Sequence, residues 1–237
     1  MLYYLFEFLE NKYHFPGAGL YQFLSFRAAI AMIISLIFSL FFGQKIINYL
    51  NILQIGETVR SLGLKGQEEK SGTPTMGGLI IIFSTIIPVI LLAKLENIYI
   101  IILLITSVWM GLIGGIDDYI KVFLKNKDGL KGGFKIIGQI ILGIFIGSIL
   151  YFHSDITVRQ KHEISNSSIS ESKIPFDLAE KAFITNMPLL KNNAFDYSSL
   201  ITWFDDGWTN YTWIIYIPIV IFIITAVSNG ANLTDGL

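Results

Sequence analysis

The amino-acid sequence predicts an all-α integral membrane protein with about five transmembrane helices and an external N-terminus. Hydrophobic residues make up 53% of the 237 residues and charged residues only 15%, whereas charged residues are about a quarter of an ordinary soluble domain. The apolar residues gather in long stretches, and the charged residues gather between them. The net charge of −1 offers no basic surface for nucleic acid, and the lack of cysteine excludes disulfides and thiolate metal sites.

Five apolar stretches are long enough, or nearly so, to cross a bilayer. A helix needs about 20 residues to span a hydrocarbon core of ~30 Å. The stretches lie at residues 23–42, 75–93, 98–116, 134–152 and 211–227. A soluble protein would have to bury five helices that are apolar on every side, and too little polar surface remains to cover them. We therefore expect one membrane domain over residues 1–237.

The positive charges of the short loops predict the orientation of these helices. Residues 43–74 and 117–135 carry nine lysines and arginines, among them Lys45, Arg60 and Lys121. Short loops rich in lysine and arginine stay in the cytoplasm. The N-terminus and the long segment 153–210 are then external, and the residues after 227 return to the cytoplasmic side.

The segments outside the apolar stretches also carry patterns. Aromatic residues at Tyr3, Tyr4, Phe6 and Phe8 suit a short helix at the membrane interface, although a frayed tail is an equal alternative for residues 1–15. In the external segment, residues 164–173 are polar and suit a flexible loop. Residues 174–190 have enough apolar side chains for a short helix lying on the membrane.

A glycine-rich loop precedes the second apolar stretch. Residues 66–78 read GQEEKSGTPTMGG, and their glycines and proline break any helix. Free backbone N–H groups at the start of the following helix, with Lys70 beside them, can hold an anion. The alternative is a flexible linker whose lysine only sets the topology.

Two adjacent acids follow the third apolar stretch. Residues 111–121 read GLIGGIDDYIK, and Asp117 and Asp118 point about 100° apart on a helix. A divergent pair suits two tasks, in which one carboxylate holds Mg²⁺ and the other accepts a proton or positions phosphate. Lys121 could pair with Asp117 at the i,i+4 spacing or bind phosphate. The alternative is a pair of acids that marks the end of a span.

A third acid, Asp235, follows the last apolar stretch in residues 229–237 (NGANLTDGL). Lys70, Asp117, Asp118, Lys121 and Asp235 are therefore expected on the same side of the membrane. Acids and lysines without a histidine or cysteine cluster fit Mg²⁺ and phosphate better than zinc or thiol chemistry. The residues alone indicate phosphate chemistry at a cytoplasmic membrane surface, with the substrate open.

Three motifs carry a resemblance to a known family. KSGTPTMGG at 70–78, GGIDDYIKV at 114–122 and NLTDGL at 232–237 resemble the polyprenyl-phosphate N-acetylhexosamine-1-phosphate transferase superfamily. Within it they are most similar to the phospho-N-acetylmuramoyl-pentapeptide-transferases, which make the first lipid-linked precursor of bacterial peptidoglycan. The resemblance implies a ten-helix bundle in the bacterial inner membrane, a homodimer, and Mg²⁺ as the cofactor.

The resemblance also implies substrates and residue roles. UDP-N-acetylmuramoyl-pentapeptide and undecaprenyl phosphate would give UMP and the lipid-linked sugar. Asp117 would be the base or phosphate-orienting group, with Asp118 beside it as a catalytic residue and metal ligand. The substrate-binding residues would be Lys70, Thr75, Lys121, Lys135, Asn232, Asp235, Gly236 and Leu237.

The family pattern continues beyond NLTDGL with further spans and the main aspartate ligand of the metal. We therefore interpret the chain as the N-terminal part of such an enzyme, and its activity alone stays open. Two alternatives are a sister transferase that uses UDP-N-acetylglucosamine and a non-catalytic membrane fragment. A transporter is disfavoured because the ionisable residues lie at the ends of the spans and not near the bilayer midplane.

Overall fold

The computed structural model describes residues 1–53, 76–126, 128–158, 181–186, 194–202 and 206–235. Its chain forms two compact units, Met1–Lys135 and Ile136–Leu237, which we describe separately. The all-α membrane class predicted from the sequence is confirmed, because helices hold nearly all the regular structure of the described residues. The expectation of a single membrane domain stays a prediction.

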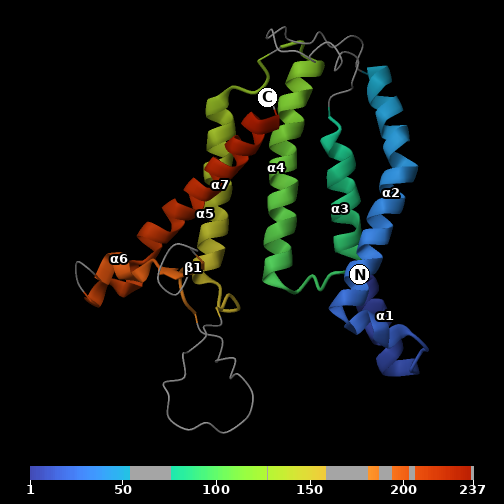
Figure 1. The fold of residues 1–237 in the computed structure, drawn as a ribbon, viewed down its shortest axis with the longest axis horizontal. Helices are drawn as coiled ribbons and strands as arrows, with labels where there is room; N and C mark the ends of the chain where they lie inside the picture. The colour runs from blue at the N-terminus through green and yellow to red at the C-terminus, as the bar shows by residue number, and fades with distance from the viewer. Residues whose placement is uncertain (54–75, 127, 159–180, 187–193, 203–205, 236–237) are drawn as a thin grey trace. The chain divides into compact units, whose positions relative to one another are not determined.

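The described residues of the first unit form four α-helices and one short 3₁₀ helix. They are α1 (Leu2–Tyr13), η1 (Ala18–Gln22), α2 (Leu24–Leu53), α3 (Gly78–Leu92) and α4 (Ile98–Val122). Helix α3 packs against both α2 and α4 (Figure 1). Asn97 caps the start of α4, since its side-chain oxygen accepts a hydrogen bond from the backbone N–H of Tyr99 at 2.9 Å.

Four of the described helices are long and apolar enough to cross a membrane, namely α2, α4, α5 (Gly132–Phe152) and α7 (Trp213–Asp235). Helix α3 lies within the expected stretch 75–93 but has only 15 residues. At 1.5 Å per residue it is about 22 Å long, shorter than a bilayer core. Its late start has a local cause, because Met76 adopts the left-handed conformation with φ 68° and cannot extend the helix.

Two positive charges from elsewhere in the chain cap the C-terminus of α3. The N-terminal ammonium of Met1 donates to the carbonyls of Ile90 and Leu91, at 2.8 and 3.0 Å. The guanidinium of Arg27, a buried residue of α2, donates to the carbonyl of Leu92 at 3.2 Å. These carbonyls have no partner inside the helix, and cations stabilise the negative end of a helix dipole.

Residues 2–13 form helix α1, which confirms the helix expected near the N-terminus. Tyr3 holds this helix at the C-terminal end of α3. The ring of Tyr3 is buried and lies under Arg27, 4.8 Å from its guanidinium carbon. Lys94 lies 4.9 Å from the same ring, and its hydrogen bond with the Tyr3 hydroxyl raises the pKa of Lys94. The aromatic N-terminus is thus an ordered helix, attached by cation–π contacts.

The second unit pairs α5 with α7. A Cβ atom added at Gly143 would lie 2.8 Å from the Cα of Ile221, and one added at Gly147 would lie 3.4 Å from the Cα of Ile217. Glycines four residues apart on one helix face allow this close approach of two backbones. These two pairs also show that α5 and α7 pack antiparallel, because the later residue on α5 meets the earlier residue on α7.

The segment 153–210 contains a small β-hairpin instead of the expected helix. Strand β1 (Ile184–Asn186) pairs antiparallel with β2 (Ala194–Asp196), and α6 (Ser198–Thr202) and η4 (Asp206–Tyr211) follow. The prediction of a helix within 174–190 is therefore wrong for 184–186. The polar loop expected at 164–173 lies outside the described residues.

Aromatic rings attach the hairpin to the ends of α5 and α7. The ring of Phe183 stacks on Tyr151 of α5 at 4.2 Å between centroids, and both rings contact Tyr216 of α7. Tyr197, which is buried, contacts Tyr216 and donates a hydrogen bond to Thr185 at 2.7 Å. We call Tyr151, Phe183, Tyr197 and Tyr216 the aromatic cluster.

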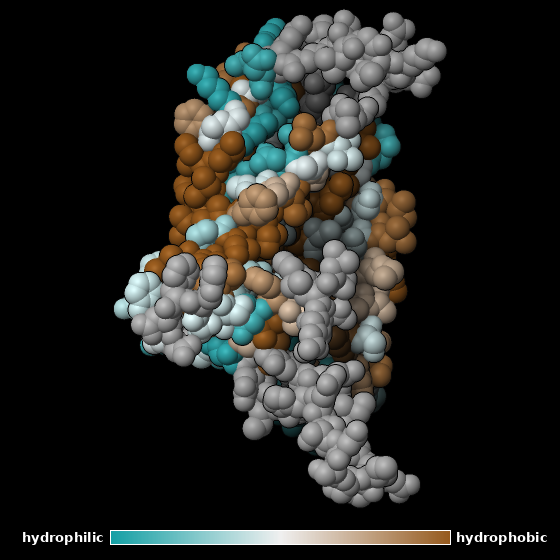
Figure 2. All heavy atoms as spheres, turned by 60° about the vertical axis from the view of Figure 1, so that its left-hand side comes forward, coloured by the Kyte–Doolittle hydropathy of each residue, from teal (hydrophilic) through white to brown (hydrophobic). Residues whose placement is uncertain are grey.

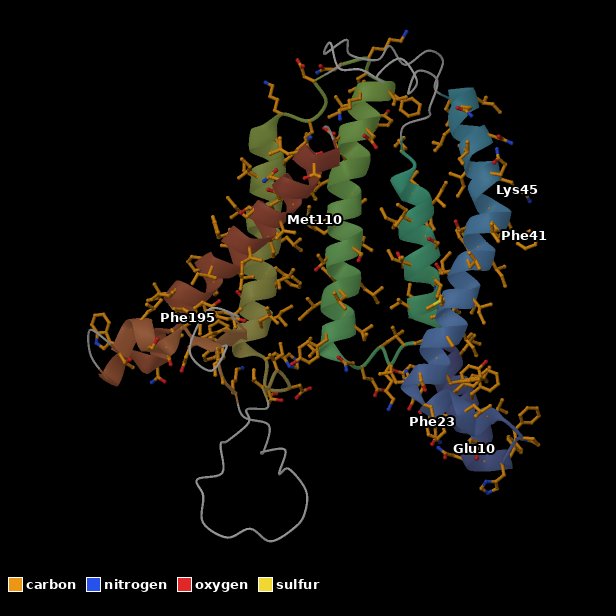
Figure 3. All side chains as sticks on the ribbon, in the orientation of Figure 1. Glu10, Phe23, Phe41, Lys45, Met110 and Phe195 are labelled. Atoms are coloured by element: carbon orange, nitrogen blue, oxygen red, sulfur yellow. The ribbon has the colours of Figure 1, made fainter. Side chains whose placement is uncertain are left out.

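The outer faces of the helices are apolar, as lipid contact requires. Figure 2 shows hydrophobic side chains covering the helices on the face in view. In the first unit, Phe41 is 69% exposed and points away from α2 into the surroundings (Figure 3). Exposed apolar side chains along a long helix are expected where lipid replaces water.

Candidate functional site

The candidate site lies at the C-terminal end of α4, where Asp117 is buried with 7% of its surface exposed. Its Oδ2 atom is 2.7 Å from the ammonium of Lys121, one helical turn later. Its Oδ1 atom is 2.8 Å from the ammonium of Lys135 and accepts a hydrogen bond from the backbone N–H of Leu130, also at 2.8 Å. One carboxylate therefore gathers two lysines and a loop amide, all within the first unit.

The loop after α4 is folded tightly around this carboxylate. Asn126 starts the turn, accepting hydrogen bonds from Asp128 N–H on its side chain and from Gly129 N–H on its carbonyl. Gly129 has φ 65° and is buried, and an added Cβ would lie 2.5 Å from Asp117 Oδ1. Only glycine fits there without strain or collision. The turn thereby brings the Leu130 amide and Lys135 to Asp117.

Asp118 points to a different side of α4. It is half-buried. Among the residues that the structure describes, none forms an ion pair with Asp118, whereas Asp117 forms two. The two acids therefore differ in their partners. The charge of Asp117 is neutralised by two lysines, whereas Asp118 keeps oxygen lone pairs that can bind a cation or accept a hydrogen bond.

The structure does not assemble all the residues expected from the sequence. Asp117, Lys121 and Lys135 meet, and Asp118 lies beside them on the helix. Asn232 is exposed near the end of α7, and Asp235 is the last residue of that helix, both in the second unit. The other expected residues, Lys70, Thr75, Gly236 and Leu237, lie outside the described part of the chain.

Sequence reasoning missed the contribution of the loop. Gly129 and Leu130 were not among the candidates, and Lys135 was expected to face phosphate and not Asp117. The Asp128-Gly129 pair is a turn signal that could have indicated the left-handed glycine. The Leu130 amide has no such signal, because any residue supplies a backbone N–H.

The site could hold an anion and, in part, a metal ion. Two ammonium groups within hydrogen-bond distance of one carboxylate can exchange it for phosphate oxygens, which they bind as strong charge-assisted donors. No three acidic or histidine side chains converge in the described residues. Mg²⁺ commonly uses one or two carboxylates with substrate phosphates and waters, so Asp118 fits as a single protein ligand.

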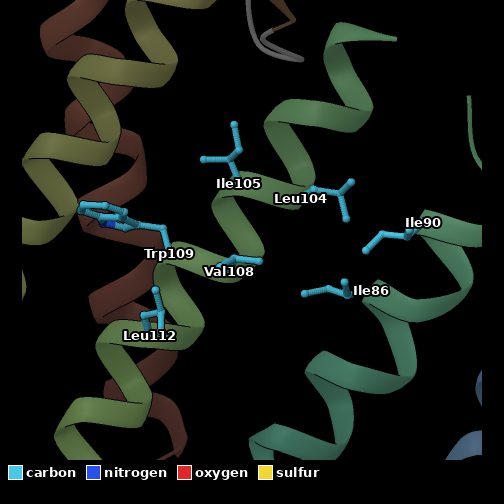
Figure 4. A pocket seen from close by; sticks show the side chains of 7 residues that line it. All are labelled: Ile86, Ile90, Leu104, Ile105, Val108, Trp109 and Leu112. Carbon is cyan, nitrogen blue, oxygen red and sulfur yellow. The ribbon is translucent and has the colours of Figure 1, made fainter. Parts of the chain in front are cut away.

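A separate cavity with an apolar lining lies earlier along α4, toward its N-terminal end. It has a volume of about 280 Å³ and is lined by Ile86, Ile90, Leu104, Ile105, Val108, Trp109 and Leu112 (Figure 4). These side chains come from α3 and α4. Because no charged residue lines it, this cavity cannot be the place of phosphate chemistry, and the acids at the end of α4 remain the candidate site.

Comparison with known proteins agrees with the motifs around this site. Residues 70–82 match the family pattern described as phospho-N-acetylmuramoyl-pentapeptide-transferase signature 1. A phospho-N-acetylmuramoyl-pentapeptide-transferase of Flavobacterium psychrophilum is 58% identical over the whole chain, and one of Flavobacterium johnsoniae is 52% identical. The chain is similar over its whole length to the phospho-N-acetylmuramoyl-pentapeptide-transferases.

This similarity extends over every residue of the chain but not over the whole length of these transferases. The chain spans 59% of the length of both Flavobacterium transferases. It spans 56% of the transferase of Parabacteroides distasonis, to which it is 49% identical. The apolar helices and this family together identify a multi-pass protein of the bacterial inner membrane.

Proposed function

We propose that the chain takes part in transferring phospho-N-acetylmuramoyl-pentapeptide from its UDP donor to undecaprenyl phosphate, with release of UMP. In this reaction a phosphate oxygen of the lipid forms a bond to the phosphorus that carries the sugar. The bond from that phosphorus to the oxygen of UMP breaks, and UMP keeps the electron pair. The family relationship supports the reaction class, and the site at the end of α4 supports the chemistry.

The observation that carries the proposal is the pair of lysines held by Asp117. Phosphoryl transfer depends mainly on positioning and on neutralising the charge of the phosphate oxygens. Lys121 and Lys135 are already gathered at one point, 2.7 and 2.8 Å from the carboxylate. We propose that an arriving phosphate takes the place of Asp117 as their partner and leaves Asp117 free to accept a proton or hold the lipid phosphate.

Asp118 has the complementary role in this proposal. No described lysine or arginine forms an ion pair with it, so it can hold Mg²⁺ together with the phosphate oxygens of the donor. When bound there, Mg²⁺ supplies positive charge against the charge that builds up during transfer. Lys70, Thr75, Asn232, Asp235, Gly236 and Leu237 are proposed to bind the nucleotide side of the donor, and a homodimer is proposed from the family resemblance.

The test is a transfer assay with purified chain in lipid vesicles. UDP-N-acetylmuramoyl-pentapeptide, undecaprenyl phosphate and Mg²⁺ are supplied, and the lipid-linked product is measured by mass spectrometry. We expect product with this donor, none after chelation of the metal, and full activity in Asp155→Asn, an exposed acid far along the chain from the site. A chain that forms no product with any donor would be a non-catalytic fragment.

The choice of sugar is tested by exchange of radiolabelled UMP into each donor. Exchange into UDP-N-acetylmuramoyl-pentapeptide is expected because the motifs and the relatives agree on that branch. Exchange only into UDP-N-acetylglucosamine would instead assign the chain to the sister transferases.

A further inference from the structure

A polar contact lies between α5 and α7 in the second unit, two helices that are mostly apolar. Gln139 of α5 is buried with 3% of its surface exposed. Its amide nitrogen donates to the hydroxyl of Ser228 at 3.0 Å and to the side-chain oxygen of Asn229 at 3.4 Å. In return the Asn229 amide nitrogen donates to the Gln139 side-chain oxygen at 2.9 Å. We call Gln139, Ser228 and Asn229 the amide clasp.

The side-chain amide nitrogen of Asn229 donates two hydrogen bonds. The same amide nitrogen also donates to the carbonyl of Thr225, one turn earlier on α7, at 2.9 Å. The bond to Thr225 lies within α7, whereas the three bonds between Gln139 and the pair Ser228 and Asn229 cross from α5 to α7, and losing them would leave the buried Gln139 amide without these partners, which is costly in an apolar environment. A single relative position of α5 and α7 satisfies them all.

The rest of the interface cannot select that position alone. Below the clasp, Gly143 faces Ile221 and Gly147 faces Ile217. Both contacts pair a glycine with an isoleucine, and the pairs repeat at one-turn spacing on both helices. A shift of α7 by one turn that placed Ile221 against Gly147 would place Thr225, a residue smaller than isoleucine, against Gly143, whereas it would separate Gln139 from Asn229. A buried polar pair is a known way to fix the register of packed helices.

The register matters because two candidate site residues come later on α7. Asn232 and Asp235 lie three and six residues beyond Asn229, about 4.5 and 9 Å further along the axis at 1.5 Å per residue. A one-turn shift would move them by about 5.4 Å, which is farther than a hydrogen bond can adjust. The position of both residues is therefore set by the clasp.

We infer that Gln139, Ser228 and Asn229 are positioning residues that fix the register of α7 and thereby place Asn232 and Asp235 for the UDP donor. This inference rests on the proposed function for the identity of the ligand only. The register itself is a property of the helix pair. It can be measured without any substrate.

The first experiment uses the lack of cysteine in the chain to measure the register. Gly147→Cys with Ile217→Cys reports the native register, and Gly147→Cys with Ile221→Cys reports a shift of one turn. We expect only the first pair to form a disulfide in membranes. With Gln139→Leu and Asn229→Leu added, we expect both pairs to form. A disulfide pattern unchanged by the two leucines would overturn the inference.

The second experiment connects the register to donor binding. In the transfer assay, Gln139→Leu with Asn229→Leu is expected to raise the KM for UDP-N-acetylmuramoyl-pentapeptide about tenfold, the effect of losing about one good hydrogen bond to the ligand. The exchanged pair Gln139→Asn with Asn229→Gln should restore much of the loss. The matched control is Thr225→Val, because the Thr225 hydroxyl bonds only to carbonyls of its own helix.

The two experiments separate failure of the inference from failure of the proposed function. A chain with no transfer activity would overturn the proposed function, while the disulfide pattern would still test the clasp. A changed disulfide pattern with an unchanged KM would show that the clasp sets the register but does not serve the donor site, and would overturn the positioning role.

Discussion

Asp117 and Asp118 are neighbours in sequence but have opposite surroundings. Asp117 is buried between two ammonium groups and a backbone amide. Asp118 is half-buried, and no described lysine or arginine forms an ion pair with it. We therefore expect substitution of the first acid to affect folding as well as activity, and substitution of the second to affect activity alone.

Asp117→Asn is expected to lower the free energy of unfolding by about 2 kcal/mol, because charge-assisted hydrogen bonds are lost and an amide N–H₂ group faces a lysine. Asp118→Asn is expected to leave stability within about 0.5 kcal/mol of the parent and to reduce the transfer rate about a hundredfold to a thousandfold. Thermal unfolding in detergent and the transfer assay measure the two effects. Equal losses of stability in both variants would contradict this division of roles.

Gly129 gives a second prediction at the scale of one residue. Gly129→Ala would add a Cβ 2.5 Å from Asp117 Oδ1 at a backbone φ of 65°. We expect a loss of about 2 kcal/mol or more from steric overlap and backbone strain together. The control is Gly133→Ala in the first turn of α5, where nothing lies within 4 Å of the added atom. Thermal unfolding measures the stability of both variants. A Gly129→Ala protein as stable as the control would show that the loop after α4 adjusts without cost.

The sequence predicts part of this site because part of it is local. The Asp117–Lys121 pair follows from i,i+4 spacing on a helix, and the divergence of the two acids follows from helical geometry. Lys135 could not be assigned to Asp117, because that contact depends on how the loop from Phe123 to Lys131 folds back. Non-local contacts of this kind are not encoded in any spacing.

At the scale of elements, α3 is stabilised by residues that lie far from it in sequence. Arg27 and the amino group of Met1 cap its last carbonyls. Arg27 is also buried, and its Nε atom has no hydrogen-bond partner, so this cap already carries a desolvation cost. The short helix α3 depends on these external donors because they complete the end that the chain itself leaves unsatisfied.

Arg27→Leu is expected to destabilise the first unit by about 2 kcal/mol, because the Leu92 carbonyl loses a charged donor and the Tyr3 ring loses its cation. Lys12→Leu is the control, since Lys12 is an exposed cation of α1 that lies over aromatic rings but caps no helix. Unfolding in detergent and protease sensitivity of α1 measure the effect. The same small change in both variants would argue that Arg27 contributes only apolar packing.

The apolar pattern of the sequence is sufficient to predict the long helices but not the short strands. The long apolar stretches predict α2, α4, α5 and α7, because a helix satisfies its own backbone in lipid. Strands β1 and β2 have three residues each, too short for an alternating pattern to appear. Their formation depends on pairing with one another and on the aromatic cluster, which a local window of sequence does not contain.

At the scale of the whole molecule, an odd number of crossings should deliver the acids of α4 and the end of α7 to the cytoplasm. The lack of cysteine permits a direct test. Single cysteines at Lys94 and Asp155 are expected to react with an impermeant maleimide added outside intact cells. Single cysteines at Lys125 and Thr234 are expected to react only after the membrane is opened.

The labelling pattern has one decisive outcome. If cysteines at Lys125 and Thr234 react from opposite sides, the lysine site and the end of α7 could not serve one substrate, and the proposed function would fail. Composition and loop charge predict the side of each loop, but they cannot predict how two compact units divide the chain, because that depends on side-chain packing.

The hairpin has a practical consequence for following this protein in cells. Its two strands carry no core of their own, and the rings of Tyr151 and Tyr216 that hold it come one from each helix of the pair. The shape of the hairpin therefore exists only while α5 and α7 are together. An antibody selected against that shape would recognise chains in which α5 and α7 are paired and ignore chains in which they are not, which makes the hairpin an epitope for monitoring assembly in isolated membranes.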